Sequence, residues 1–245
     1  MPNGSDMAVV IPARNEEATV AAVVRDALAA LPGASAIVVS DGSTDATAER
    51  ARAAGAEVLD FPCNLGVGAA VQAGLRRARE RGFRFVARMD ADGQHVAGEI
   101  PAMLRKMEES GADFVSGSRF LPGSSFEAGS TPARRLGNKL LARFLSAICR
   151  TQITDPTTGL WCVREPLLRY FAHRYPGEYP EPEAMALLRR QGYVMAEVPV
   201  RVLPRRAGRS HVRSAGVVYF AFRVGLALLA DRVRPVDRRF AAPSR

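Results

Sequence analysis

Short apolar runs alternate with longer helical patterns through the first 120 residues, and this alternation constrains the fold more than any other feature. Repeated strand–helix units are typical of an α/β fold with a mostly parallel central sheet. The predicted strands are Ala8–Pro12, Ala36–Ser40, Glu57–Asp60, Phe85–Met89 and Asp113–Gly117. The predicted helices are Glu17–Leu31, Asp45–Ala54, Ala69–Arg81 and Val96–Ser110.

The length of 245 residues and a hydrophobic content of 47% suit one sizeable core. We therefore expect one main domain over residues 1–211 and a tail over residues 212–245. No cationic start and no apolar stretch precede Met7, so no secretory signal is visible and a cytoplasmic location is expected. The three cysteines lack CxxC spacing, which argues against a disulfide framework and a zinc site.

The net charge of the chain lies in its tail. From Arg201 to Arg245 there are 11 arginines and two acids, which together equal the whole formal charge of +9. Within the tail, residues 215–230 are almost wholly apolar but are interrupted by Arg223. A bilayer crossing needs about 20 apolar residues, so this segment suits the headgroup layer better than a span. Charge alone cannot choose between anionic lipid, nucleic acid and a phosphorylated ligand.

A second basic segment, Pro132–Arg150, has the pattern of an amphipathic helix. Apolar residues recur every four positions, and basic residues flank the stripe. Such a helix either lies on a membrane surface or packs on a core, and the pattern leaves both open. The stripe consists of Leu136, Leu140, Phe144 and Ile148.

Polar clusters follow the predicted strands, at the edge of the sheet where open α/β proteins bind ligands. They are Ala13–Glu17, Asp41–Asp45, Asn64–Gly68, Asp90–His95 and Ser118–Arg119.

One of these clusters offers oxygen ligands at alternate positions, namely Asp90, Asp92 and Gln94. In an extended loop these oxygens could converge on Mg²⁺ or Mn²⁺, which would bridge a diphosphate. Two solvated carboxylates in a turn are the simpler interpretation. The glycine loop at 64–68 lacks a dinucleotide fingerprint, because Val71 stands where the third glycine is needed. The cluster at 41–45 could be a turn with a helix cap.

In order and spacing, however, the motifs resemble family 2 glycosyltransferases of the GT-A fold. The chain looks like the dolichol-phosphate mannosyltransferase branch, which includes bacterial polyprenyl-phosphate glycosyltransferases, from about Met7 to Ala230. The motifs that carry the resemblance are Ile11–Glu16, Ser40–Asp45, Asn64–Gly68, Asp90–Gln94, Gly117–Phe120, Asp155–Gly159 and Arg205–Ser210.

The resemblance implies roles for matching positions. The nucleotide-sugar donor would contact Pro12, Ala13, Arg14, Glu16, Asp41, Gly68, Asp90, Ala91, Asp92, Arg205, Ser210 and His211. The metal would bind Asp90, Asp92 and Gln94, and the acceptor would contact Arg119, Arg134 and Arg135. The residues implied in catalysis are Asp92, Arg119, Asp155 and Arg205.

The sequence departs from the family pattern at two places. His211 stands where that branch has a Lys that helps to close a loop over the diphosphate, and Ser40 replaces a first Asp before Asp41. These changes leave loop closure and base selectivity open. The segment with the acidic pair Glu181 and Glu183 resembles the corresponding segment of bacterial members. The pair either has a functional role or caps a helix, and the sequence leaves both open.

The implied reaction is an inverting transfer of a sugar from a UDP- or GDP-sugar to a polyprenyl phosphate at an anionic, cytoplasmic membrane face. Because a phosphate monoester is already ionised at neutral pH, no strong base is required. Asp155 would either position arginines or act as a base for a hydroxyl acceptor. The resemblance also implies two interface helices, Pro132–Arg150 and Ala215–Asp231, and leaves an integral-membrane partner open.

Three alternatives compete with this hypothesis. The same fold could glycosylate a soluble hydroxyl acceptor. A sugar-nucleotide pyrophosphorylase would need a glycine-rich motif near the first strand, where Pro12–Glu17 stands instead. A nucleic-acid binder would use the basic tail, but the aromatic residues there do not interleave with the arginines, so no nucleic-acid partner is predicted.

Overall fold

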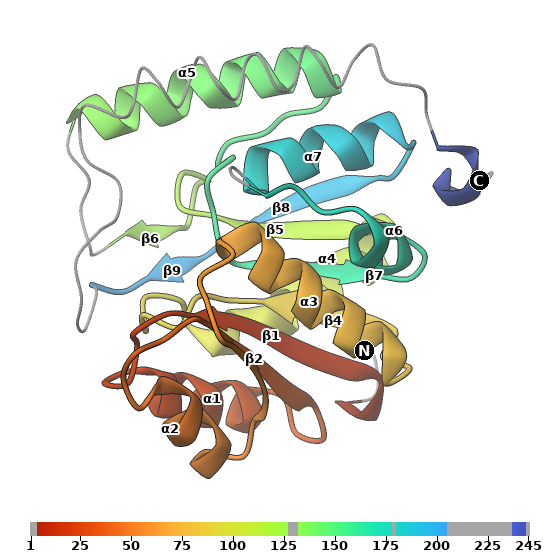
Figure 1. Ribbon diagram of the computed structural model, residues 1–245. Helices are drawn as coiled ribbons and strands as arrows, with labels where there is room; N and C mark the ends of the chain where they lie inside the picture. The colour runs from red at the N-terminus through yellow and green to blue at the C-terminus, as the bar shows by residue number, and fades with distance from the viewer. Residues whose placement is uncertain (1–3, 127–131, 178–179, 205–236, 244–245) are drawn as a thin grey trace.

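The structure is a computed structural model that describes residues 4–126, 132–177, 180–204 and 237–243. A seven-stranded sheet forms its centre, with the order β3-β2-β1-β4-β7-β5-β8 (Figure 1). Its strands are β1 Met7–Ala13, β2 Ser35–Asp41, β3 Glu57–Phe61, β4 Phe85–Arg88, β5 Phe114–Ser118, β7 Trp161–Arg164 and β8 Met195–Pro199. A short second sheet pairs β6 (Ser125–Phe126) with β9 (Arg201–Val202).

Six of the seven central strands run parallel, and only β7 is antiparallel to its neighbours β4 and β5. The carboxyl ends of the parallel strands therefore meet at one edge. All seven residues of β1 are buried, because helices cover both faces of the sheet. Met7, Val9 and Ile11 belong to one apolar cluster, whereas Ala8 and Val10 belong to the other.

The predicted α/β architecture is confirmed, and the predicted strands and helices of the first half are all present. The helices are α1 Val20–Ala30, α2 Thr47–Ala53, α3 Val67–Glu80 and α4 Ile100–Ser110. Helix α1 begins three residues later than predicted, because the carbonyl of Glu16 accepts the amides of Thr19 and Val20 in a preceding turn. Helix α4 likewise follows a 3-10 turn, η2 (Ala97–Glu99), and has Pro101 in its first turn.

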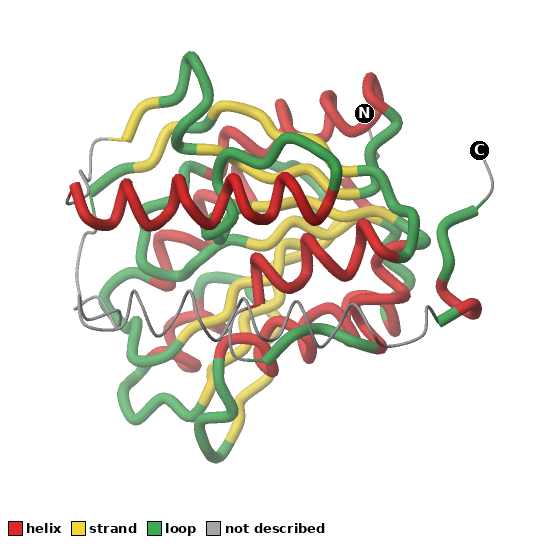
Figure 2. The backbone as a smooth tube through the Cα atoms, turned by 90° about the horizontal axis from the view of Figure 1, so that it is seen from above, coloured by secondary structure: helices red, strands yellow, loops and turns green. Residues whose placement is uncertain are grey.

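The second half contains elements that the sequence pattern did not reveal. The helix predicted over 132–150 is present as α5 (Pro132–Cys149), which extends across the described fold in Figures 1 and 2. Helices α6 (Leu167–His173) and α7 (Pro180–Arg190), together with β7, β8 and β9, were not predicted. None of the described helices combines the length and apolar character that a bilayer crossing requires.

The last described residues return to the main domain. The short helix η3 (Arg238–Phe240) places the carbonyl of Phe240 2.9 Å from the hydroxyl of Tyr193, which donates to it. The amide of Ala242 donates to the carbonyl of Gln191. The predicted interface helix Ala215–Asp231 lies outside the described residues, and the domain boundary at 211/212 stays a prediction.

Candidate functional site

The polar clusters after β1 and β2 lie side by side at the carboxyl edge of the sheet. The amide of Thr44 donates to the side-chain oxygen of Asn15 at 2.8 Å, and the amide of Glu16 donates to the hydroxyl of Thr47 at 2.8 Å. Pro12 and Ala13 are buried at the end of β1, whereas Arg14 is exposed just beyond it. The structure thus brings the predicted nucleoside-binding residues of the first two motifs together.

Asp41, at the end of β2, fastens the glycine loop to the sheet. Its two carboxylate oxygens accept the amides of Leu65 at 2.7 Å and Gly66 at 2.9 Å. Gly42 allows this approach, because its φ is +64° and a side chain there would overlap the backbone of residues 63 and 64. In this conformation Asp41 serves the loop, and its assignment to the nucleobase stays a prediction.

Gly68 lies in the first turn of α3, where the chain of residues 176–177 crosses it. A Cβ atom at this position would overlap the carbonyl oxygens of Pro176 and Gly177. The glycine is therefore needed for packing between α3 and the segment that leads to α7. This packing brings the start of α7 toward the carboxyl edge of the sheet.

The acidic cluster follows β4 directly. Asp90 has a side chain that is 37% exposed, and its Oδ1 lies 2.6 Å from Nη2 of Arg88. Asp92 is buried, and its Oδ1 accepts the amide of Gln94 at 3.0 Å. The Nδ1 atom of His95 accepts the amide of Asp90 at 3.1 Å. Burial lowers the pKa of His95, so the imidazole that accepts the amide of Asp90 is neutral.

Gln94 connects this cluster to the segment that carries the later arginine motif. Its side-chain amide donates to the carbonyl of Leu203 at 3.2 Å, and the amide of Leu203 donates to the carbonyl of Gln94 at 2.9 Å. Leu203, two positions before Arg205, is therefore held against the acidic loop. Arg205, Ser210 and His211 lie outside the described residues, so their predicted roles remain predictions.

Arg119 and Asp155 form a bidentate ion pair at the end of β5. Nε and Nη2 of Arg119 lie 2.6 and 2.7 Å from the two carboxylate oxygens, and Nη2 also donates to the hydroxyl of Thr157 at 2.7 Å. Asp155 is 0% exposed, whereas the side chain of Arg119 is 22% exposed. Burial opposes the charge of Arg119, but the hydrogen bond to Asp155 prevails and raises its pKa. The guanidinium is therefore a fixed positive charge that is partly exposed.

Glu197 of β8 supports this pair and was not predicted. Its carboxylate accepts the amide and hydroxyl of Thr154, each at 2.8 Å, and the amide of Asp155 at 3.1 Å. Burial raises the pKa of Glu197. The available signal was an acid in the otherwise apolar run of residues 194–200, which becomes interpretable only when that run is recognised as a strand.

A second ion pair lies deeper, beneath the acidic cluster. Arg88 is 2% exposed, and Nη1 lies 3.6 Å from the carboxylate of Glu181, at the start of α7. Burial opposes the charge of Arg88, but Asp90 and Glu181 raise its pKa. Burial also raises the pKa of Glu181. Arg88 was missed by sequence reasoning, although an arginine in the apolar run of β4 was a signal.

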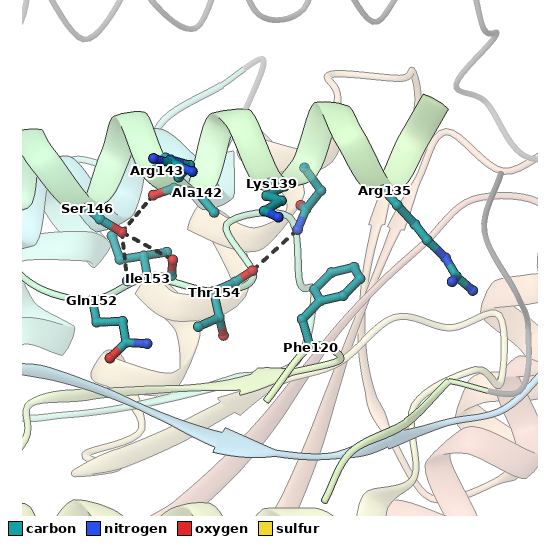
Figure 3. A pocket seen from close by; sticks show the side chains of 10 residues that line it. Phe120, Arg135, Lys139, Ala142, Arg143, Ser146, Gln152, Ile153 and Thr154 are labelled. Atoms are coloured by element: carbon teal, nitrogen blue, oxygen red, sulfur yellow. Dashed lines mark hydrogen bonds between the residues drawn. The ribbon is translucent and has the colours of Figure 1, made fainter. Parts of the chain in front are cut away.

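A cavity of about 600 Å³ is lined by α5, by the segment 152–154 that is hydrogen-bonded to it, and by Phe120 (Figure 3). It is linked to the Arg119 pair, because Thr157 donates to the side-chain oxygen of Asn138 on α5 at 3.0 Å. The cavity is lined by Phe120, Arg135, Asn138, Lys139, Ala142, Arg143, Ser146, Gln152, Ile153 and Thr154. The predicted acceptor residue Arg135 thus lines this cavity, whereas the side chain of Arg134 lies outside what the structure describes.

One face of helix α5 packs on the core and a neighbouring apolar face is exposed, while its predicted contact with a membrane stays a prediction. Leu141 and Leu145 are buried in the core, whereas Leu136, Leu140 and Phe144 are 59%, 60% and 41% exposed. Helix α5 therefore has a packed face, with Leu141 and Leu145, beside an exposed apolar face, with Leu136, Leu140 and Phe144.

The acidic cluster suits a hard divalent cation. Among the described residues, no group of three or more His, Cys, Asp or Glu side chains could hold a metal by itself. Asp90 and Asp92 supply two carboxylates and Gln94 a side-chain oxygen, which would leave other positions for the oxygens of a diphosphate. The exposed side chain of Asp90 makes such shared binding sterically open.

Comparisons with known proteins agree with this arrangement. A family described as glycosyl transferase family 2 matches residues 8–170. The chain is 28% identical to polyprenol monophosphomannose synthase of Mycolicibacterium smegmatis, over 94% of this chain and 91% of that protein. It is 30% identical to undecaprenyl-phosphate mannosyltransferase of Micrococcus luteus, over 85% and 88%. It is 33% identical to dolichyl-phosphate hexose transferase of Haloferax volcanii, over 80% and 82%.

Solved structures show the same fold. One is glucosyl-3-phosphoglycerate synthase from Mycobacterium tuberculosis in complex with Mn²⁺, uridine diphosphate and phosphoglyceric acid. It is 25% identical to this chain, with a TM-score of 0.65 over 95% of this chain and 80% of that one.

Proposed function

Because this chain belongs to glycosyl transferase family 2, we propose that it transfers a sugar from a nucleotide diphosphate sugar to a polyprenyl phosphate at a membrane surface. The three relatives named above carry a polyprenol, undecaprenyl phosphate or dolichyl phosphate in their names. Each is covered over more than four fifths of its length, so the similarity includes the second half of the fold.

The observation that carries the acceptor proposal is the Arg119–Asp155 pair. A hydroxyl acceptor needs a base within hydrogen-bond reach. Asp155 is fully buried and both of its oxygens are bound by Arg119, so it is poorly placed for that task. A lipid phosphate is ionised at neutral pH and needs a fixed positive charge instead, which the partly exposed guanidinium of Arg119 offers.

The donor would be held at the carboxyl edge of β1, β2 and β4. Asp90, Asp92 and Gln94 are the residues that would bind Mg²⁺ or Mn²⁺, and the fit of their oxygen ligands supports this assignment. When bound, such a cation stabilises the negative charge of the departing diphosphate. The loop held by Asp41 and the exposed Arg14 would contact the nucleotide.

The charged groups proposed to bind the donor and the acceptor influence one another. Asp90 and Glu181 help to raise the pKa of Arg119, which supports proposed donor and acceptor groups that lie near one another. In the proposed step, a lipid phosphate oxygen forms a bond to the anomeric carbon as the bond from that carbon to the diphosphate oxygen breaks. Attack from the opposite face inverts the configuration, and no proton is transferred. Alignment of the two phosphates by Arg119 is the contribution of the protein.

Helix α5 supports the membrane part of the proposal. Leu136, Leu140 and Phe144 form an exposed apolar face, and Arg135, Lys139 and Arg143 line the adjoining cavity (Figure 3). Apolar side chains with flanking cations suit an anionic lipid interface. The cavity beside Arg119 would bind the end of the lipid that carries the phosphate.

The second candidate is transfer to a small soluble acceptor that bears a phosphate or carboxylate. It is favoured by one observation, the neighbouring structure that contains phosphoglyceric acid. The chemistry at Arg119 would be similar, but the exposed face of α5 would have no role in it.

A panel of UDP- and GDP-sugars with Mn²⁺ tests the proposal, with undecaprenyl phosphate and phosphoglyceric acid as competing acceptors. We expect a sugar-linked lipid phosphate from at least one donor. Transfer to phosphoglyceric acid with an inert lipid would establish the second candidate. Release of free sugar alone, with neither acceptor modified, would contradict both.

A further inference from the structure

The acidic start of α7 remains unexplained by the reaction as described so far. Glu181 approaches Arg88 rather than a donor-binding loop, at 3.6 Å from Nη1. Arg88 in turn lies 2.6 Å from Asp90, the proposed metal ligand. One buried arginine therefore stands between two carboxylates that come from distant parts of the chain.

The surrounding backbone is shaped to admit this arginine. A Cβ atom on Gly159 would overlap both Nη1 of Arg88 and Oδ2 of Asp90, so only a glycine leaves room for the pair. Within the described part of the chain, Nε and Nη1 of Arg88 have no hydrogen-bond partner. The approach of Glu181 is thus an ion pair that a small movement could convert into a hydrogen bond.

Arg88 is held in a buried position and keeps its positive charge. It is 2% exposed, and an arginine side chain does not lose its proton in a protein. A divalent cation bound by Asp90 would share that carboxylate with the guanidinium. Two positive centres would then compete for one negative group, in a place where water screens them poorly. A second carboxylate beside Arg88 relieves this competition.

We infer that Glu181 is a positioning residue that keeps Arg88 neutralised when Asp90 binds a divalent cation, and thereby strengthens the metal-dependent binding of the nucleotide. This inference rests on the proposed function, because it assumes that Asp90 binds the metal of the donor complex. Glu181 acts through Arg88 and does not need to touch the donor.

The test is Glu181→Gln, studied by calorimetry with UDP and GDP in the presence and absence of Mn²⁺. Loss of a group that supports a metal ligand typically costs about 10- to 100-fold in metal affinity. We expect a loss of that size in the Mn²⁺-dependent binding of whichever nucleotide the unmodified protein prefers. Binding without Mn²⁺ should be unchanged. Glu57→Gln, which breaks contacts with Arg77 and Arg81 on the surface, is the matched control.

A double-mutant cycle with Arg88→Met shows whether Glu181 acts through the arginine. The loss caused by Glu181→Gln should disappear in the Arg88→Met background, and Glu181→Asp should restore part of the affinity. Thermal unfolding reports whether each variant is folded. If Arg88→Met does not fold, the comparison with and without Mn²⁺ in Glu181→Gln decides by itself.

Three results would overturn the inference. One is unchanged Mn²⁺-dependent affinity in folded Glu181→Gln, and another is an equal loss with and without Mn²⁺. The third is a loss of affinity for UDP-glucose or GDP-mannose with none for the free nucleotide, which would show that Glu181 contacts the sugar. Failure of the proposed function is distinguishable, because the unmodified protein would then bind neither nucleotide in a Mn²⁺-dependent way.

Discussion

Asp41 and Asp155 are both buried aspartates at the carboxyl edge of the sheet, but they hold different partners. Asp41 accepts two backbone amides from the glycine loop, whereas Asp155 accepts two guanidinium nitrogens from Arg119. The proposed donor side is therefore organised by contacts between side chains and backbone. The proposed acceptor side is organised by an ion pair that extends through Thr157 to Asn138 on α5.

Because of this difference, substitutions of Asp41 and of Arg119 should affect different properties of the protein. Replacing Asp41 leaves two amides without their acceptor, which chiefly affects the conformation of a loop. Replacing Arg119 leaves a fully buried carboxylate without its counter-charge and also removes the positive group proposed to align the acceptor. Mutations on the two sides should thus be distinguishable by whether binding, transfer or folding changes most.

The largest effect is expected for Asp92→Ala, which should abolish Mn²⁺-dependent binding of UDP and GDP. The fold should persist, because Asp92 lies in the loop after β4 rather than in a strand or helix, and a single hydrogen bond such as the one it accepts from the amide of Gln94 is worth about 1 kcal/mol. Calorimetry measures the binding. Asp60→Ala, at a surface ion pair with Arg52, is the matched control. Retained metal-dependent affinity in the folded Asp92 variant would contradict the metal assignment.

Arg119→Ala should lower the rate of transfer to undecaprenyl phosphate by about 100- to 1,000-fold, as the loss of one charge-stabilising donor does in other enzymes. Binding of the nucleotide should change much less. Arg119→Lys keeps a positive charge but not the bidentate geometry, so its activity should lie between the two. Steady-state rates and donor affinities, measured for each variant, show whether transfer or donor binding is lost. An equal loss in donor binding would place Arg119 on the donor side.

Asp41→Asn should destabilise the protein by about 1–3 kcal/mol, because an amide side chain cannot accept both backbone amides as a carboxylate does. Chemical denaturation measures the change in the free energy of unfolding. Once the variant is saturated with donor, its transfer rate should stay near that of the unmodified protein. Unchanged stability combined with altered preference between UDP and GDP would show that Asp41 serves the nucleobase instead.

The smallest effect is expected for Leu140→Ser on the exposed face of α5. Transfer of one leucine from an apolar to an aqueous setting is worth about 1.5–3 kcal/mol, and partial insertion into an interface would yield less. Binding to anionic vesicles should weaken by up to about tenfold, as co-sedimentation would measure. Transfer to a short, water-soluble polyprenyl phosphate should be unaffected. Vesicle binding identical to that of the unmodified protein would exclude this face as a membrane contact.

Local sequence patterns determined the first half of the fold and the composition of the candidate site. The strands and helices of residues 7–118 could be predicted because each consists of a short apolar run or a helical repeat whose period is visible without its neighbours. The acidic cluster at 90–94 could be found for the same reason, since its ligands are close in sequence. The parallel strands then required these clusters to meet at one edge.

Only the tertiary structure decided how the charges are paired. Arg88 and Glu181 are 93 positions apart, and Glu197 reaches Thr154 across 43 positions. Sequence periodicity cannot reveal such pairs, because their proximity depends on β7 entering the sheet antiparallel and on α7 packing against α5. The sequence left the role of Asp155 open between positioning arginines and acting as a base for a hydroxyl acceptor. Its burial against Arg119, which favours a phosphate acceptor over a hydroxyl, is a property of three-dimensional packing and of the energetic cost of leaving a buried charge unpaired.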